Sequence, residues 1–256
     1  TRNTIKSIVT KEDCQIIFID TPGMHKPKNR LGEYMVSVAE GTLNEVDVVL
    51  FTVDATDTQP GAGDLYVANQ IKGLKTPVFL VINKIDLISR EHILPVISNY
   101  KDLTGFQAIV PVSAANNDGL DVLASEIKKA LPEGPRYFPD DMLTDQPEKL
   151  IAAELIREKA LILLSDEVPH GVGVEVTAFK ERQDREMVHI QATIYCEKES
   201  HKGIIIGKEG KMLKKIGSLA RVETENLLGT KVFLELWVKV KPDWRNNLSM
   251  LKTLGY

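Results

Sequence analysis

Apolar residues in the first half of the chain fall in short, near-continuous runs separated by segments of mixed polarity. The runs are rich in Val, Ile and Phe, as in strands that are covered on both faces of a sheet. A strand, helix, strand order at this spacing predicts a parallel sheet with crossover helices. The predicted strands are Cys14–Asp20, Val46–Asp54, Pro77–Ile85 and Ala108–Val112, and the predicted helices are Leu31–Asn44, Asp64–Lys72, Arg90–Asp102 and Asp118–Leu131.

The pattern changes at both ends of this first region. Thr4–Thr10 precedes the first strand across the polar tripeptide Lys11–Asp13, which predicts a hairpin with one antiparallel edge strand. Residues 132–148 hold four prolines and an adjacent Asp pair without an apolar period, which is typical of a linker. We therefore expect one domain over residues 1–131, a linker over 132–148 and a second domain over 149–256.

The second domain has a different order of elements. Leu150–Leu164 is amphipathic and predicts a helix, and Lys211–Leu228 predicts a second helix that carries basic residues. Predicted strands are Gly173–Lys180, Met187–Cys196 and Lys231–Val240. A helix, two strands, a helix and a final strand predict a small α+β module.

Charge is distributed unevenly between the two domains. The chain has a net charge of −4, yet residues 198–221 contain seven basic and two acidic residues. Such a local basic surface indicates a polyanionic partner, although a solvated helix face explains it equally well. No stretch approaches the ~20 consecutive apolar residues of a membrane span. The two cysteines, Cys14 and Cys196, lack the spacing of a zinc site.

The tetrapeptide Asn83–Asp86, with the sequence NKID, follows an apolar strand and is the strongest chemical signal. The carboxylate of Asp86 can accept hydrogen bonds from N1 and N2 of guanine, for which adenine has no matching pair of donors. Lys84 can lay its aliphatic stem over the purine ring, and Asn83 can join this loop to a phosphate loop. With Ile85 between them, these residues predict a guanine site.

Two further motifs occur in an order that supports this prediction. Asp20-Thr21-Pro22-Gly23 ends the first strand as a DxxG turn, in which Gly23 would contact a γ-phosphate. Ser113-Ala114-Ala115 ends the last strand, where a backbone N–H would reach the guanine O6. A simple β-turn at Asp20–Gly23 and a helix-capping role for Ser113 are the alternatives.

The glycine-rich stretch Gly203–Gly210 supports a different hypothesis. Gly207-Lys208-Glu209-Gly210 fits the GXXG loop of KH domains, which brings the backbone close to nucleotides. We expect an apolar turn, Ile204-Ile205-Ile206, to form a floor for bases, and Lys211, Lys214 and Lys215 to supply positive charge. The stretch does not match a phosphate loop, because Glu209 stands where Ser or Thr would bind Mg²⁺.

Several longer segments resemble the Era family of GTPases over the length of the chain. They are TRNTI, DTPGMHKPK, NKID, VPVSA, LPEGPRYFPDDMLTDQPE, IREK, GIIIGKEG and ELWVKV. The resemblance implies an α/β fold with a Ras-like P-loop GTPase domain, incomplete at its N-terminus, followed by an α+β type II KH domain.

The resemblance also implies the ligands and the role. It implies a GTP-hydrolysing switch that binds GTP or GDP with Mg²⁺, held by Thr1 and Asp20. Its implied partners are small-subunit (16S) rRNA near the 3′ end and the 30S subunit, whose maturation it assists. Members often carry Gly where this chain has Glu209, which places a negative charge beside the RNA backbone. We further expect a cytoplasmic monomer with peripheral contact at the inner face of the membrane.

The resemblance leaves two questions about catalysis. A phosphate loop GxxxxGK[ST] is expected to precede Thr1, and without it we expect these residues to bind nucleotide poorly. Met24 follows DTPG, where relatives of Ras have a water-orienting Gln, so the catalytic residue is unknown and slow turnover stimulated by RNA is expected. An RNA-binding scaffold without nucleotide binding is the alternative function.

Overall fold

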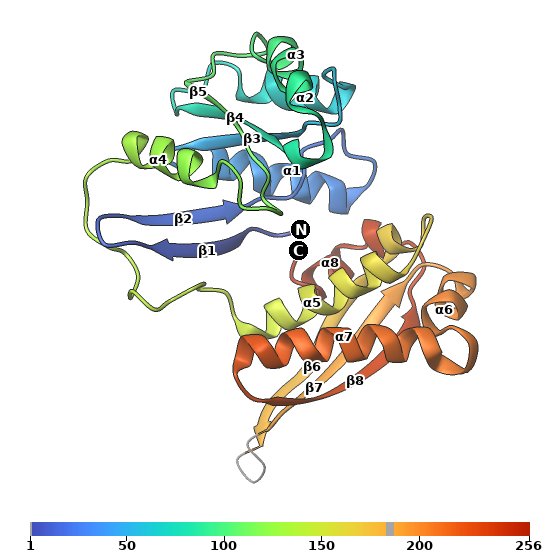
Figure 1. The fold of residues 1–256 in the computed structure, drawn as a ribbon. Helices are drawn as coiled ribbons and strands as arrows, with labels where there is room; N and C mark the ends of the chain where they lie inside the picture. Colours follow the sequence, from blue (N-terminus) through green and yellow to red (C-terminus); the bar gives the residue numbers. More distant parts are fainter. Residues whose placement is uncertain (1, 183–186) are drawn as a thin grey trace. The chain divides into compact units, whose positions relative to one another are not determined.

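A computed structural model describes residues 2–182 and 187–256 of the chain. The described residues divide into two compact units between Thr144 and Asp145, with Asn29–Leu31 grouped with the second unit. Each unit builds its own hydrophobic core and its own sheet or sheets (Figure 1).

The first unit contains the predicted parallel sheet. Its strands β3, β4 and β5 lie in that order, and both pairs are parallel. The middle strand β4 is almost wholly buried because helices cover both faces of such a sheet. The four helices agree with their predicted bounds to within two residues. The elements are β3 Val49–Asp54, β4 Val78–Asn83, β5 Ala108–Pro111, α1 Arg30–Leu43, α2 Ala62–Ile71, α3 Arg90–Tyr100 and α4 Leu120–Ala130.

The predicted hairpin is confirmed, but its strands do not join the parallel sheet. β1 (Ile5–Thr10) and β2 (Gln15–Asp20) pair antiparallel as a separate two-stranded sheet. Among the described residues no strand pairs with both β2 and β3, so the expectation that Cys14–Asp20 belongs to the parallel sheet is wrong here. Side-chain packing joins the hairpin to the parallel sheet instead: Ile16 of β2 lies in one hydrophobic core with Phe79, Val110 and Ile127.

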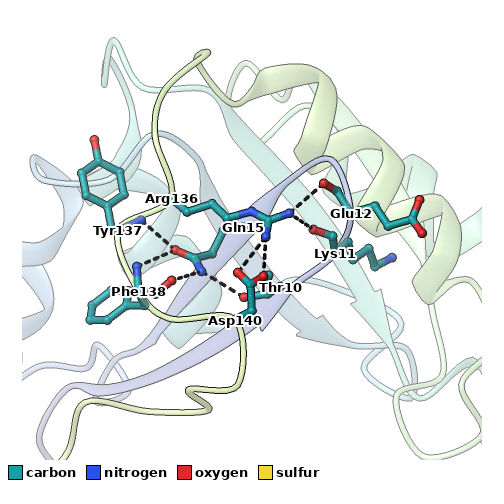
Figure 2. A network of polar contacts seen from close by, with 8 residues as sticks. All are labelled: Thr10, Lys11, Glu12, Gln15, Arg136, Tyr137, Phe138 and Asp140. Atoms are coloured by element: carbon teal, nitrogen blue, oxygen red, sulfur yellow. Dashed lines mark hydrogen bonds and ion pairs between the residues drawn. The ribbon is translucent and has the colours of Figure 1, made fainter.

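Much of the predicted linker is attached to this hairpin rather than separate from it. The side chain of Gln15 bonds the backbone of Tyr137 and Phe138 at 2.9–3.0 Å. Arg136 donates to the carbonyls of Lys11 and Glu12 and pairs with Asp140 (Figure 2).

Further along, the N–H of Ile8 donates to the carbonyl of Leu143 at 2.8 Å. The segment up to Thr144 therefore belongs to the first unit, and the boundaries predicted at 131 and 148 need correction.

The second unit is a three-stranded sheet with two long helices on one face (Figure 1). β6 and β7 are antiparallel, and β8 lies parallel to β7 as an edge strand. Buried residues of the helices and of all three strands share one core. The principal elements are α5 Glu148–Leu163, β6 Gly173–Arg182, β7 Met187–Cys196, α6 Glu199–Ile206, α7 Lys211–Leu228, β8 Lys231–Val240 and α8 Leu248–Thr253.

Two of these elements were missed by the sequence reading. α6 occupies the place of the predicted apolar turn, and Ile205 within it is completely buried. α8 follows a buried Trp244, whose indole N–H donates to the carbonyl of Gly171 at 2.9 Å. Over the described ranges, no helix is both long enough and apolar enough to cross a bilayer.

Candidate functional site

Loops at the carboxyl ends of β3, β4 and β5 are joined by hydrogen bonds. Asn83, the last residue of β4, accepts at Oδ1 from the N–H of Ala114 at 3.0 Å and from the N–H of Lys84 at 2.8 Å. Its carbonyl accepts from Ala55 at 2.8 Å, after β3. The N–H of Ile85 donates to Val112 at 3.2 Å. The NKID loop and the Ser113–Ala115 loop are therefore joined to each other by hydrogen bonds.

The carboxylate of Asp86 is oriented by Ser113. The Ser113 hydroxyl, which is buried, donates to Oδ1 of Asp86 at 2.6 Å and accepts from the N–H of Asn116 at 3.2 Å. The next helix, α4, begins only at Leu120, so the alternative of Ser113 as a helix cap is wrong. One edge of the Asp86 carboxylate is thus fixed, and its other lone pairs remain available to a ligand.

Lys84 stands in an uncommon backbone conformation beside an acidic partner. Its φ is +65°, in the left-handed region, and its Nζ lies 2.6 Å from Oδ2 of Asp54 at the end of β3. The ammonium lowers the pKa of the Asp54 carboxyl from 3.8 to about 2, with hydrogen bonds from Thr56 adding to the shift. The same pairing raises the pKa of Lys84. Both groups are therefore charged at neutral pH.

The predicted phosphate-sensing loop follows β2. Asp20 ends the strand and is exposed, and residues 21–27 adopt neither helix, strand nor hydrogen-bonded turn. A simple β-turn therefore does not account for DTPG. Pro22 is buried, whereas Thr21 and Met24 are half-buried and Gly23 is exposed. Thr1, the other predicted Mg²⁺ ligand, lies outside the described residues, so the Mg²⁺ assignment stays a prediction.

In the second unit, the GKEG loop connects α6 and α7 by backbone conformations that favour glycine. Gly207 has φ 72° and ψ 173°, and a Cβ on it would lie 2.7 Å from Cβ of Met212. Gly210 has φ 74°, and Glu209 between them has φ 54°. The loop therefore needs Gly at 207 and is strained at Glu209, where a side chain costs about 1–2 kcal/mol.

A groove of ≈ 340 Å³ lies beside this loop, between α7 and β8. Gly217 lets the two elements approach, because a Cβ there would lie 3.2 Å from Cδ1 of Leu236. Lys214 and Arg221 stand at its margin, and the exposed Lys208, Lys211 and Lys215 lie nearby in sequence. The lining residues are Gly210, Leu213, Lys214, Gly217, Ser218, Arg221, Leu234 and Leu236.

The apolar floor predicted for this site is partly wrong. Ile205 has no exposed side chain and belongs to the core of the unit, so it cannot contact a base. Ile204 is 48% exposed and Ile206 is half-buried, so these two still fit the prediction, and Gly203 lies within α6 on the surface. The apolar surface of the groove comes instead from Leu213, Leu234 and Leu236.

Sequence reasoning missed two kinds of residue. Gly217 and Arg221 continue the groove face of α7 that begins at the predicted residues Gly210 and Lys214, and the spacing of four, three and four marks one helix face. Asp54 ends a predicted strand at the same sheet edge as NKID, which is the signal that could have found it. Within the described part of the chain, no group of three His, Cys, Asp or Glu side chains could hold a metal ion.

Comparisons with protein families match both units. Residues 1–133 match the elongation factor Tu GTP binding domain, and residues 167–245 match the KH domain. The chain is 64% identical to GTPase Era of Ruminiclostridium cellulolyticum, covering 100% of this chain and 85% of that protein. It is 56% identical to GTPase Era of Alkaliphilus metalliredigens, with 100% and 86% coverage.

Two solved structures are similar over the full length. One is Era in complex with MgGDPNP and nucleotides 1506–1542 of 16S ribosomal RNA, with a TM-score of 0.94 and 43% identity over 100% of this chain and 87% of that one. The other is an Aquifex aeolicus Era variant bound to GDP·AlF4⁻, with a TM-score of 0.93 and the same identity and coverage.

Proposed function

The chain belongs to the GTPase Era family, and we propose that it works as a guanine-nucleotide switch that binds the 3′ region of 16S rRNA through its KH unit. It is a GTPase, and GTP or GDP with Mg²⁺ are its cofactors. Because 16S rRNA is the RNA of the 30S subunit, we propose that binding to it assists maturation of that subunit. The observation that carries the nucleotide half is the Asp86 carboxylate held by Ser113 at 2.6 Å.

The geometry of the NKID loop fits a guanine base. With one oxygen oriented by Ser113, Asp86 can accept from N1 and N2 of the base without reorganising. Asn83 engages the N–H of Ala114, so the N–H of Ala115 is the donor we assign to the guanine O6. Lys84 covers the face of the ring.

Asp20, through water, and Thr1 would hold Mg²⁺. The ion would neutralise phosphate charge when bound. Gly23 would donate its N–H to the γ-phosphate. Met24 has no donor to orient water, so intrinsic turnover is slow and rises when RNA binds. Single-turnover hydrolysis by the full-length gene product with and without the 3′ RNA tests this, and equal rates would contradict it.

Replacement of one carboxylate tests the base assignment. Asp86→Asn exchanges an acceptor for an amide donor, which matches the C2 carbonyl of xanthine instead of the guanine amino group. We expect GDP affinity of the full-length gene product to fall roughly 10²-fold or more and XDP affinity to rise. Asp102→Asn, an exposed change in the same unit, serves as the control. Unchanged GDP affinity would refute the guanine assignment.

The groove between α7 and β8 supports the RNA half of the proposal. Gly210, where a Cβ would meet no atom within 4 Å, leaves room for a nucleotide backbone to approach, and the leucines of the groove offer an apolar surface to bases. Lys208, Lys211, Lys214 and Lys215 are exposed and supply positive charge.

The salt dependence of RNA affinity distinguishes binding in this groove from non-specific attraction of RNA to basic residues elsewhere on the protein. Lys214→Ala should weaken binding of a 3′-end 16S oligonucleotide and lower the slope of log K against log salt by about 1. Lys252→Ala removes the same exposed charge on α8 and should leave the slope unchanged. Equal effects of the two changes would refute the groove as the binding site.

We propose a cytoplasmic monomer with peripheral contact at the inner face of the membrane, which the family resemblance supports. Sedimentation tests the monomer, and flotation with anionic vesicles tests the contact. The NKID loop and the Ser113–Ala115 loop, which we call the guanine loops, are joined by hydrogen bonds. This arrangement favours nucleotide binding over the alternative of an RNA-binding scaffold without it.

A further inference from the structure

Asp54 lies at the sheet edge that carries the guanine loops but belongs to none of the three motifs. It ends β3 and pairs with Asn83 in the parallel register between β3 and β4. The register places its side chain next to the loop that follows β4. The side-chain contacts of Asp54 therefore bear directly on the NKID loop.

Both carboxylate oxygens of Asp54 have partners. Oδ1 accepts from the backbone N–H of Thr56 at 2.9 Å and from its hydroxyl at 2.8 Å. Oδ2 accepts from Nζ of Lys84 at 2.6 Å. Thr56 thus holds the carboxylate, and the carboxylate holds the lysine. A chain of two contacts fixes the far end of a long side chain.

This fixation matters because Lys84 would otherwise be mobile. Its side chain is 54% exposed, and a free lysine loses rotamer entropy when a ligand orders it. With its ammonium anchored on β3 and its backbone at φ +65°, the aliphatic stem is already confined before nucleotide arrives. Preorganisation of this kind increases affinity without any contact between Asp54 and the ligand.

We infer that Asp54 is a positioning residue for guanine-nucleotide binding, acting through Lys84 by holding its stem where the purine ring stacks. The inference rests on the proposed guanine site. A purely structural role, in which Asp54 only closes the turn at Thr56, is the competing explanation. The two differ in one respect: positioning requires Lys84, whereas closing the turn does not.

A double-mutant cycle on the full-length gene product distinguishes them. Asp54→Asn keeps an acceptor for Thr56 but lets an amide donor face the ammonium. We expect GDP affinity, measured with a fluorescent GDP analogue, to fall roughly threefold to tenfold. In a Lys84→Ala background the same change should have no further effect.

Asp102→Asn is the matched control, since it removes an exposed aspartate charge from the same unit and is not among the groups that act on Lys84. Equal losses from Asp54→Asn in both backgrounds, or no loss in either, would overturn the inference. Asp86→Asn is measured in parallel. If that change also leaves GDP affinity intact, the guanine site itself is wrong; if it abolishes binding while Asp54→Asn is silent, only the positioning role fails.

Discussion

The guanine loops and the GKEG loop are constructed in different ways. In the first unit, side chains hold the loops: Ser113 orients Asp86, Asn83 bridges to Ala114, and Asp54 anchors Lys84. In the second unit, backbone conformation shapes the loop, with positive φ at Gly207, Glu209 and Gly210. A site held by side chains is lost by deleting a functional group, whereas a site shaped by the backbone is lost by adding a Cβ.

The largest effect is expected from adding that Cβ at position 207. Gly207→Ala meets both a φ, ψ pair open almost only to glycine and a contact at 2.7 Å with Met212. We expect about 2–4 kcal/mol less stability in urea denaturation and loss of RNA binding. Gly203→Ala, in α6 with open space around it, should be neutral or stabilising by up to about 1 kcal/mol. Equal stabilities of the two variants would contradict the backbone explanation.

Deletion of a hydroxyl should have the next largest effect, on the other site. Ser113→Ala leaves the Asp86 carboxylate without its charge-assisted bond, which is worth about 1.5–3 kcal/mol. GDP affinity of the full-length gene product should fall by roughly tenfold or more in titration calorimetry. Ser89→Ala, at an exposed serine before α3, is the control. RNA affinity in the absence of nucleotide should not change.

A smaller effect in the opposite direction is expected at Glu209. Glu209→Gly removes a side chain from a residue at φ 54° and should stabilise the second unit by about 1 kcal/mol. It also removes a negative charge next to the groove, so RNA binding should tighten. Glu209→Gln removes only the charge, and comparison of the two variants separates backbone strain from electrostatics. A destabilised Glu209→Gly would mean that the exposed ion pair with Lys211 outweighs the strain.

The smallest effect concerns acid stability. The folded-state pKa of Asp54 is about 2, below its ordinary value of 3.8, because of Lys84 and Thr56. Its contribution to stability is therefore complete above about pH 4 and is lost as the pH falls toward 2. Because the pair is partly exposed, we expect a loss below about 1 kcal/mol. Urea midpoints at pH 5 and pH 2.5 should differ less in Asp54→Asn than in the unchanged protein.

The amino-acid sequence alone predicted most elements and both motif loops. Runs of apolar residues in β3, β4 and β5 and the helical period of α7 are local patterns, and NKID and GKEG each span four residues. The position of NKID at a strand end and of GKEG before a helix could also be predicted, because each motif directly adjoins its element in the sequence. α6 was missed because its eight residues give a weak period around Gly203.

Contacts between distant segments were decided only by the tertiary structure. The docking of residues 136–144 on the hairpin, the burial of Ile205 and the groove between α7 and β8 depend on which segments meet. The partnership of Asp54 with Lys84 spans thirty positions and arises from strand register. Residue type and spacing specify what each segment can do, but register and packing select its partners, because those are set by the free energy of the whole fold.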